Sequence, residues 1–208
     1  MISNETDARS FIAGLGGAEA IAKLEVLAED LRAENARQNL VSKGSLEEVW
    51  VRHFADSAQL IPHVPRETRG AWFDLGSGAG FPGLVLAILR PDEPTVLIES
   101  RKRRIEWLEA MARKLELANC EIEGKRLELA DTRKAAVISA RAFAPLPKLL
   151  SLSARFSTAR THWVLPKGRS AAQEVEELPR KQRKMFHVEH SITDDEAGIV
   201  VGQGKVEA

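Results

Sequence analysis

Four glycines and an acidic residue lie within the stretch "WFDLGSGAGFPGL" at positions 72–84, and this composition is typical of a loop that binds a nucleotide. From Gly78 to Gly83 the spacing is the G-x-G-x-x-G of dinucleotide-binding folds. From Asp74 to Gly80 the order is that of an acid-first methyl-donor loop. Glycines allow a backbone to approach a ligand closely and to adopt positive φ angles. The loop therefore predicts a nucleotide-like ligand of one of these two kinds.

The acid before the loop discriminates between the two ligands. A dinucleotide site directs a helix N-terminus at a pyrophosphate, and a carboxylate beside that anion would repel it. S-adenosylmethionine instead carries a positively charged sulfonium and an amino group, which Asp74 would hold. Glu99, at the end of the next strand expected, suits the ribose hydroxyls that both ligands have. We therefore expect S-adenosylmethionine, with the alternative that Asp74 is only a turn or helix-capping acid.

The elements around the loop predict an α/β fold of the doubly wound type. Strands are expected at residues 71–75, 95–99, 120–123, 136–139 and 162–165. Helices are expected from Pro82 to residue 90, from a cap at Ser100 through Leu115, and over 146–156. This alternation predicts a mostly parallel sheet whose ligand lies at the carboxyl ends of its strands. Two late strands, 185–190 and 198–202, predict an antiparallel hairpin at one edge.

The first third of the chain has a different, helical pattern. Apolar residues recur at helical spacing over 18–34, and Ser45 to Glu48 has the pattern of a capping box that would open a helix to about residue 61. Pro62 and Pro65 then mark a linker. We therefore expect a helical extension at 1–66 and a compact ligand-binding core at 67–208.

Composition limits the classes of protein further. The chain has 208 residues, equal numbers of acidic and basic residues, and one cysteine, which excludes an internal disulfide framework and a cysteine-based zinc site. No apolar run is long enough to cross a bilayer and the N-terminus is polar, so we expect a cytoplasmic protein with no membrane partner. The basic charge is local: 12 Lys and Arg against 4 Asp and Glu at 133–190, plus the run from Arg101 to Arg104. These runs are either solvated surface or a face for phosphates.

Several further stretches, taken together with the loop, resemble one known family. They are "NLVS" at 39–42, "WVRHFADS" at 50–57, "DLGSGAGFPGLVLAI" at 74–88, "LIES" at 97–100, "SARAFAPLPKLL" at 139–150, and Lys167-Gly168. In this order they resemble the bacterial ribosomal RNA small subunit methyltransferase G family, also called glucose-inhibited division protein B. Departures from its pattern are Ala58, where leucine is usual, and Pro166.

The resemblance implies a class I Rossmann-like methyltransferase fold with an N-terminal helical extension. It also implies an enzyme that transfers methyl from S-adenosylmethionine to N7 of a guanosine in 16S rRNA, in the small ribosomal subunit or its assembly intermediate. We expect a monomer and no metal. Carried over by position, the donor contacts would be Gly76 and Phe81 in the loop, Leu127 and Glu128 after the third strand, and Arg141 after the fourth.

The full set of expected donor contacts is Asp74, Gly76, Gly78, Phe81, Glu99, Leu127, Glu128 and Arg141. Gly76 would admit the methionine part and Phe81 would form an apolar wall. Leu127 and Glu128 would pack the adenine and accept its amino group, whereas Arg141 would lie over the pocket or bind phosphate.

For the RNA we expect contacts from Arg101, Lys102 and Lys167, with strand stabilisation as the alternative for Lys167. His53 and Asp56 lie three residues apart and form either a general base or a structural pair. Guanine N7 carries no proton, so we expect no catalytic base. Two other function classes remain open on the residues alone: a nicotinamide-dependent oxidoreductase, and a non-catalytic RNA-binding protein with a donor-type fold.

Overall fold

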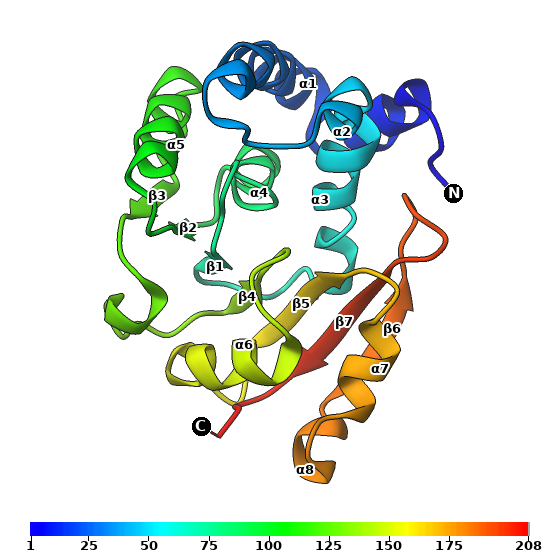
Figure 1. Ribbon diagram of the computed structural model, residues 1–208, viewed down its shortest axis with the longest axis vertical. Coiled ribbons are helices and arrows are strands. Elements are labelled where there is room, and N and C mark those ends of the chain that lie inside the picture. The colour runs from blue at the N-terminus through cyan, green and yellow to red at the C-terminus, as the bar shows by residue number, and fades with distance from the viewer. Residues whose placement is uncertain (208) are drawn as a thin grey trace.

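A seven-stranded sheet forms the centre of the protein, in a computed structural model that describes residues 1–207 (Figure 1). The strand order is β3-β2-β1-β4-β5-β7-β6. The first five strands are parallel, whereas β7 runs antiparallel to both β5 and β6. The strands are β1 Trp72–Leu75, β2 Thr95–Ile98, β3 Cys120–Glu123, β4 Val137–Ser139, β5 His162–Lys167, β6 Phe186–His190 and β7 Gly198–Gln203. The predicted parallel sheet and edge hairpin are thus confirmed.

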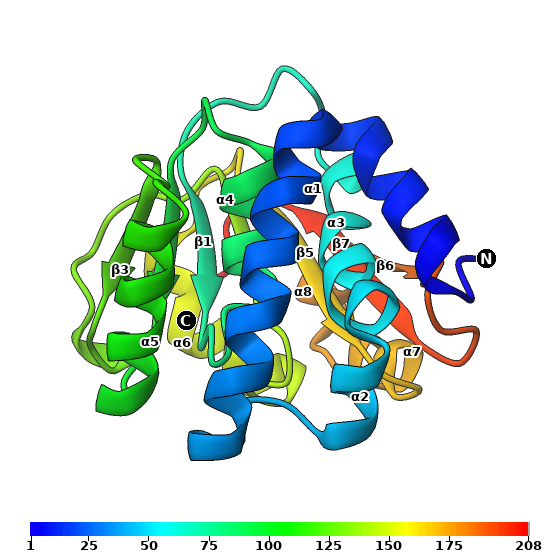
Figure 2. The same ribbon diagram turned by 90° about the horizontal axis from the view of Figure 1, so that it is seen from above.

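Helices cover both faces of this sheet (Figures 1 and 2). One face carries α1, α4 and α5, and the other carries α6 and α7. The helices are α1 Glu5–Gln38, α2 Lys43–Glu47, α3 Asp56–Ala58, α4 Gly83–Leu89, α5 Lys102–Lys114, α6 Leu146–Ser153, α7 Ala171–Glu176 and α8 Arg180–Arg183. A π-helical turn spans Trp50–Ala55, and 3-10 turns span Ile61–His63, Leu127–Leu129 and Ala154–Phe156. None of the helices in the described part of the chain is long and apolar enough to span a membrane.

Alternation along the central strands supplies the hydrophobic clusters on the two faces of the sheet. In β2, Val96 and Ile98 face the cluster beneath α6 and α7, whereas Leu97 faces the cluster beneath α1, α4 and α5. This second cluster contains packed residues from several segments, the first being Ala8 in α1 and the last Leu117 after α5. The N-terminal helices therefore share a hydrophobic core with the sheet, and the division at residue 66 stays a prediction.

The N-terminal third corrects three local predictions. α1 begins at Glu5, well before residue 18, and is interrupted at Gly17, whose φ is 67°. The helix expected over 45–61 is instead three short turns, α2, the π-helical turn and α3. The capping-box assignment was wrong as well, because the N-cap of α2 is Ser42, whose hydroxyl accepts the Ser45 N–H. Ser45 also donates to the Ser42 carbonyl, and it contacts a ring nitrogen of His53.

The N-terminus and the turn between β6 and β7 meet beside α3. The Ile2 N–H donates to the Ile192 carbonyl, in the turn between β6 and β7. Gln59, directly after α3, donates to the hydroxyls of Ser191 and Thr193 in the same turn. Arg52 forms an ion pair with Asp194 of this turn at 3.1 Å. The last hairpin is thus fastened to the segment that precedes β1.

Candidate functional site

The loop after β1 is held in place by its own backbone and by α5. Gly76, Gly78 and Gly80 have φ angles of 70°, 58° and 103°, which side chains rarely tolerate. The Gly76 and Ser77 N–H groups donate to the Ile98 carbonyl at the end of β2. The indole N–H of Trp107 donates to the Ala79 carbonyl at 3.0 Å. Glycine is therefore required here because the backbone must turn tightly between β1 and α4.

Asp74 is buried below this loop rather than exposed to a ligand. Its carboxylate accepts the Gly83 N–H at 3.1 Å, at the start of α4, and the Ser139 hydroxyl at 3.0 Å. Burial raises the pKa of Asp74 to about 6, against the lowering effect of these hydrogen bonds. The contacts in the structure are those of the alternative weighed from sequence, a helix-capping acid, and a contact between Asp74 and the donor stays a prediction.

A small pocket opens beside the loop, at the carboxyl ends of β1 and β2. This glycine-loop pocket has a volume of about 220 Å³ and is lined by Gly76, Ile98, Glu99, Ser100, Arg101, Arg104, Lys125, Leu127, Ala142 and Phe143. Glu99 accepts the Gly78 N–H through one carboxylate oxygen and the Ser100 and Arg101 N–H groups through the other. Its carboxylate is thus fixed at the position where the sequence predicts a ribose contact.

The structure brings together only part of the predicted donor set. Gly76, Glu99 and Leu127 line the glycine-loop pocket, and Gly78 is tied to it through Glu99. Arg101, expected at the RNA, lies in the same lining. Ser100 does not cap α5 with its side chain, as the sequence suggested, because Arg101 occupies the N-cap position. Glu128 is exposed and does not line the pocket, and its contact with adenine stays a prediction.

Phe81 and Arg141 lie outside the glycine-loop pocket, and their contact with the donor stays a prediction. The Phe81 ring is buried and stacks on the His53 ring, with centroids 4.8 Å apart and planes 11° apart. The Arg141 guanidinium lies 5.4 Å from the centroid of Phe81. Both side chains therefore join the loop region to the N-terminal segment.

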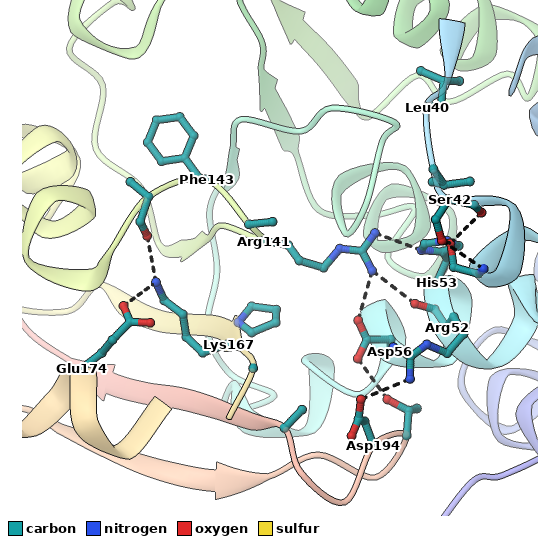
Figure 3. Close-up of a pocket in the computed structure, with 18 of the residues that line it drawn as sticks. Leu40, Ser42, Arg52, His53, Asp56, Arg141, Phe143, Lys167, Glu174 and Asp194 are labelled. Atoms are coloured by element: carbon teal, nitrogen blue, oxygen red, sulfur yellow. Dashed lines mark hydrogen bonds and ion pairs between the residues drawn. The ribbon is translucent and has the colours of Figure 1, made fainter. Parts of the chain in front are cut away.

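Arg141 is the centre of a polar network in a second, larger pocket (Figure 3). It bonds the Asp56 carboxylate at 3.1 Å, the Arg52 carbonyl at 3.3 Å and His53 Nδ1 at 3.0 Å. A guanidinium has only donors, so Nδ1 is the acceptor and Nε2 carries the proton toward the Ser45 hydroxyl. Burial, with the charges of Arg141 and Arg52, lowers the pKa of His53 to about 3.

This wide pocket has a volume of about 720 Å³. Its walls come from the segment before β1, the loop after β4, the end of β5 and the turn before β7, and they include Leu40, Ser42, Arg52, His53, Asp56, Arg141, Phe143, Lys167, Glu174 and Asp194 (Figure 3). Ala142 and Phe143 line both pockets, so the two cavities meet at the loop after β4.

The two lysines predicted to contact RNA occupy different settings. The Lys167 ammonium bonds the Ala144 carbonyl at 2.8 Å and the Glu174 carboxylate at 2.9 Å. Glu174 also accepts the Leu146 N–H, so Lys167 holds the loop after β4 from inside the wide pocket. Lys102 is largely exposed, 3.9 Å from Glu106, and lines neither pocket. Contact of either lysine with RNA stays a prediction.

Sequence reasoning missed Arg104 and Phe143 in the glycine-loop pocket. Arg104 belongs to the basic run already noted, and a Cβ on Gly78 would lie 3.0 Å from its guanidinium nitrogen. The signal for Phe143 was its place in "SARAFAPLPKLL", directly after a strand that ends at the ligand edge of the sheet.

Comparison with solved structures places the fold. An RNA methyltransferase from Salinibacter ruber, in complex with S-adenosyl-L-homocysteine, superposes with a TM-score of 0.53 at 16% identity, over 73% of this chain and 92% of that one. A precorrin-6y C5,15-methyltransferase from Geobacter metallireducens superposes with a TM-score of 0.54 at 11% identity, over 81% and 92%. The strand order, the loop after β1 and these neighbours define a class I methyltransferase fold.

Sequence comparison identifies the family within that class. The family model described as rRNA small subunit methyltransferase G matches residues 20–198. A ribosomal RNA small subunit methyltransferase G of Erythrobacter litoralis is 61% identical over 205 residues, covering 99% of both chains. That of Novosphingobium aromaticivorans is 54% identical over 186 residues, covering 88% of this chain and 80% of the other. The chain belongs to the rRNA small subunit methyltransferase G family, as the resemblance predicted.

Proposed function

We propose that this protein transfers a methyl group from S-adenosylmethionine to N7 of a guanosine in 16S rRNA, within the small ribosomal subunit or its assembly intermediate. The observation that carries the proposal is the pair of adjoining pockets at the carboxyl ends of the strands. The glycine-loop pocket offers a fixed carboxylate at Glu99 for the donor, and the wide pocket beside it has room for a nucleotide. Family membership supplies the substrate class.

The residues of the glycine-loop pocket fit the donor. Gly76 and Gly78 lack the Cβ atoms that would fill the cradle, and Gly78 is closed in by Arg104. Glu99 would accept the ribose hydroxyls through its remaining lone pairs, and Leu127 would pack against the adenine. When bound, the donor supplies a methyl group activated by a positively charged sulfur.

On the acceptor side, the chain need only place the base. Guanine N7 has a lone pair and no proton, so the reaction needs no general base. His53 agrees with this, because an imidazole whose pKa is lowered to about 3 and whose Nδ1 already accepts from Arg141 is a poor base. Catalysis then depends on alignment of the two substrates and on exclusion of water between them.

The test compares 16S rRNA from cells with and without the protein by mass spectrometry. We expect one guanosine to lose a single methyl group when the gene is deleted, and purified protein with labelled S-adenosylmethionine to restore it on small subunits. Unchanged rRNA would refute the proposal. S-adenosylhomocysteine, and not a nicotinamide dinucleotide, should raise the thermal midpoint of the protein, whereas the reverse would favour an oxidoreductase.

A further inference from the structure

Phe143 lies at the boundary of the two pockets, and its ring rests on the glycine loop. A methyl group added to Gly76 would overlap the Phe143 ring, whose atoms Cε2 and Cγ would lie 3.1 and 3.2 Å from it. The ring therefore occupies the space next to the α-carbon of Gly76, on the side of the loop that faces the glycine-loop pocket. Figure 3 shows the same ring turned away from Arg141 and His53.

The size of the glycine-loop pocket agrees with such an obstruction. Its volume of about 220 Å³ is below the range of about 300–1,000 Å³ in which nucleotide-sized and drug-sized ligands bind. Gly76 offers only backbone and Glu99 is held by three N–H groups, so neither can yield. The lining side chains that can rotate are those of Arg101, Arg104, Lys125 and Phe143, and of these four only Phe143 also lines the wide pocket. Phe143 is half-buried and also lines the wide pocket, so its ring has a cavity into which it can rotate.

The backbone around Phe143 is fastened at both ends. Arg141 is bound to Asp56 on one side, and the Ala144 carbonyl is bound to Lys167 on the other. Between these anchors Ala142 has a φ of 51°, a left-handed conformation that costs energy for a residue with a Cβ. The loop therefore holds Phe143 at one place while its side chain remains the element able to rotate.

From this geometry we propose that Phe143 couples the two substrates, which rests on the proposed function. Without donor, its ring lies on Gly76. Donor binding displaces the ring toward the wide pocket, where it presents an aromatic face for the target guanine to stack on. Phe143 is then a positioning residue that makes RNA-base binding favourable only after the donor is in place. Because coupling between two ligands is reciprocal, a bound purine also strengthens donor binding.

Two variants separate obstruction from stacking. Phe143→Ala removes both, whereas Phe143→Leu keeps bulk against Gly76 and lacks the aromatic face. Phe143→Tyr keeps both and serves as the conservative control. In calorimetry with the whole protein, Phe143→Ala should bind S-adenosylhomocysteine about fivefold more tightly than wild type. The reason is that the arrangement with the ring on Gly76 no longer competes with the ligand. Phe143→Leu and Phe143→Tyr should bind it as wild type does. Weaker binding by Phe143→Ala would overturn the proposal.

The second arm measures coupling with guanosine 5′-monophosphate as the probe. Saturating S-adenosylhomocysteine should raise the affinity of wild type and Phe143→Tyr for this nucleotide about tenfold, the usual effect of one base stacked on an aromatic ring. It should leave Phe143→Ala and Phe143→Leu unchanged. Equal enhancement in all four proteins would overturn the proposal, and so would no enhancement in wild type.

These binding measurements do not depend on rRNA methylation. If 16S rRNA is unchanged by deletion of the gene, the proposed function fails while the coupling data remain readable. If rRNA is methylated and the four proteins behave alike, only the role of Phe143 fails. A purely structural role would instead lower the thermal midpoint of the variants and weaken the binding of both ligands together.

Discussion

The glycine-loop pocket and the wide pocket are built in different ways although they share one loop. The first is a product of backbone: positive φ angles at three glycines, strand-end N–H groups, and a carboxylate held by them. The second is a product of side chains from distant parts of the sequence, joined through Arg141, Asp56 and Lys167. A backbone site is encoded locally and is readable as a motif. A side-chain site depends on the tertiary fold, so each of its members is open to individual test.

The largest effect is expected from Arg141→Ala, which removes the centre of the wide pocket. The variant leaves Asp56 without its ion-pair partner and frees Nδ1 of His53. Loss of these charged hydrogen bonds should lower methyl transfer to small subunits about a hundredfold. The affinity for S-adenosylhomocysteine should change less than about threefold. Arg141→Lys keeps the charge but not the fork geometry of the guanidinium. Its rate of methyl transfer should lie between those of wild type and Arg141→Ala.

Calorimetry beside single-turnover kinetics checks this prediction. A loss of donor affinity that matches the loss of rate would return Arg141 to the donor, where the family resemblance had placed it.

The next effect concerns Asp74, buried beneath the glycine loop. Its pKa is about 6 in the folded protein against 3.8 as the ordinary value, so ionisation opposes folding. The contribution of Asp74 to the free energy of unfolding is fully present below about pH 4. It is lost as pH rises through about 6, and the loss amounts to about 2–3 kcal/mol. Asp74→Asn keeps an acceptor for the Gly83 N–H but does not titrate. Its free energy of unfolding, relative to wild type, should therefore rise across this interval.

Urea unfolding of both proteins between pH 4.5 and 8 measures the difference. A constant difference across that range would show that Asp74 does not change its protonation on folding.

A smaller effect is expected at Glu99, and it tests the glycine-loop pocket directly. Glu99→Gln should weaken the binding of S-adenosylhomocysteine about tenfold, because hydrogen bonds to a carboxylate are stronger than those to an amide. Glu123→Gln is the matched control: Glu123 is equally buried at the end of the neighbouring strand β3, but lines neither pocket. Equal losses in both variants would point to a general effect of strand-end carboxylates on the sheet.

The smallest effect is expected for the pH dependence of the single-turnover rate, to which His53 should contribute nothing. With its pKa lowered to about 3, His53 stays neutral through the neutral range. With saturating donor and small subunits, the single-turnover rate should be nearly constant from about pH 6.5 to 8.5, a window in which an ordinary histidine would titrate. A bell-shaped profile that His53→Gln abolishes, in a variant that still binds both substrates, would make His53 a general base.

The same contrast explains what was predictable from sequence. Strand positions followed from apolar runs and turn residues, and the loop at 76–83 followed from its glycines, because both signals are local. Glu99 and Leu127 line the same pocket because strand ends converge at one edge of a parallel sheet, and their contact with the donor stays a prediction.

Local signals do not suffice where a distant partner decides the contacts. Arg141 and Phe81 contact His53 through pairings across 88 and 28 residues, which no local pattern reveals, and their contact with the donor stays a prediction. Ser45 and Ser100 have the composition of caps, but Ser42 and Arg101 occupy those positions. The short helices α7 and α8 lack enough apolar periodicity to be predicted, and they form where packing on β6 and β7 permits.

The fastening of the last hairpin onto the N-terminal segment has a consequence for biosynthesis. Chains leave the ribosome N-terminus first, so the segment carrying Arg52 and Gln59 emerges long before Thr193 and Asp194, which it must bind. The glycine loop can therefore fold while the wall of the wide pocket is still inside the exit tunnel. The wall of the wide pocket is thus completed only after Thr193 and Asp194 have been synthesised, later than the glycine loop.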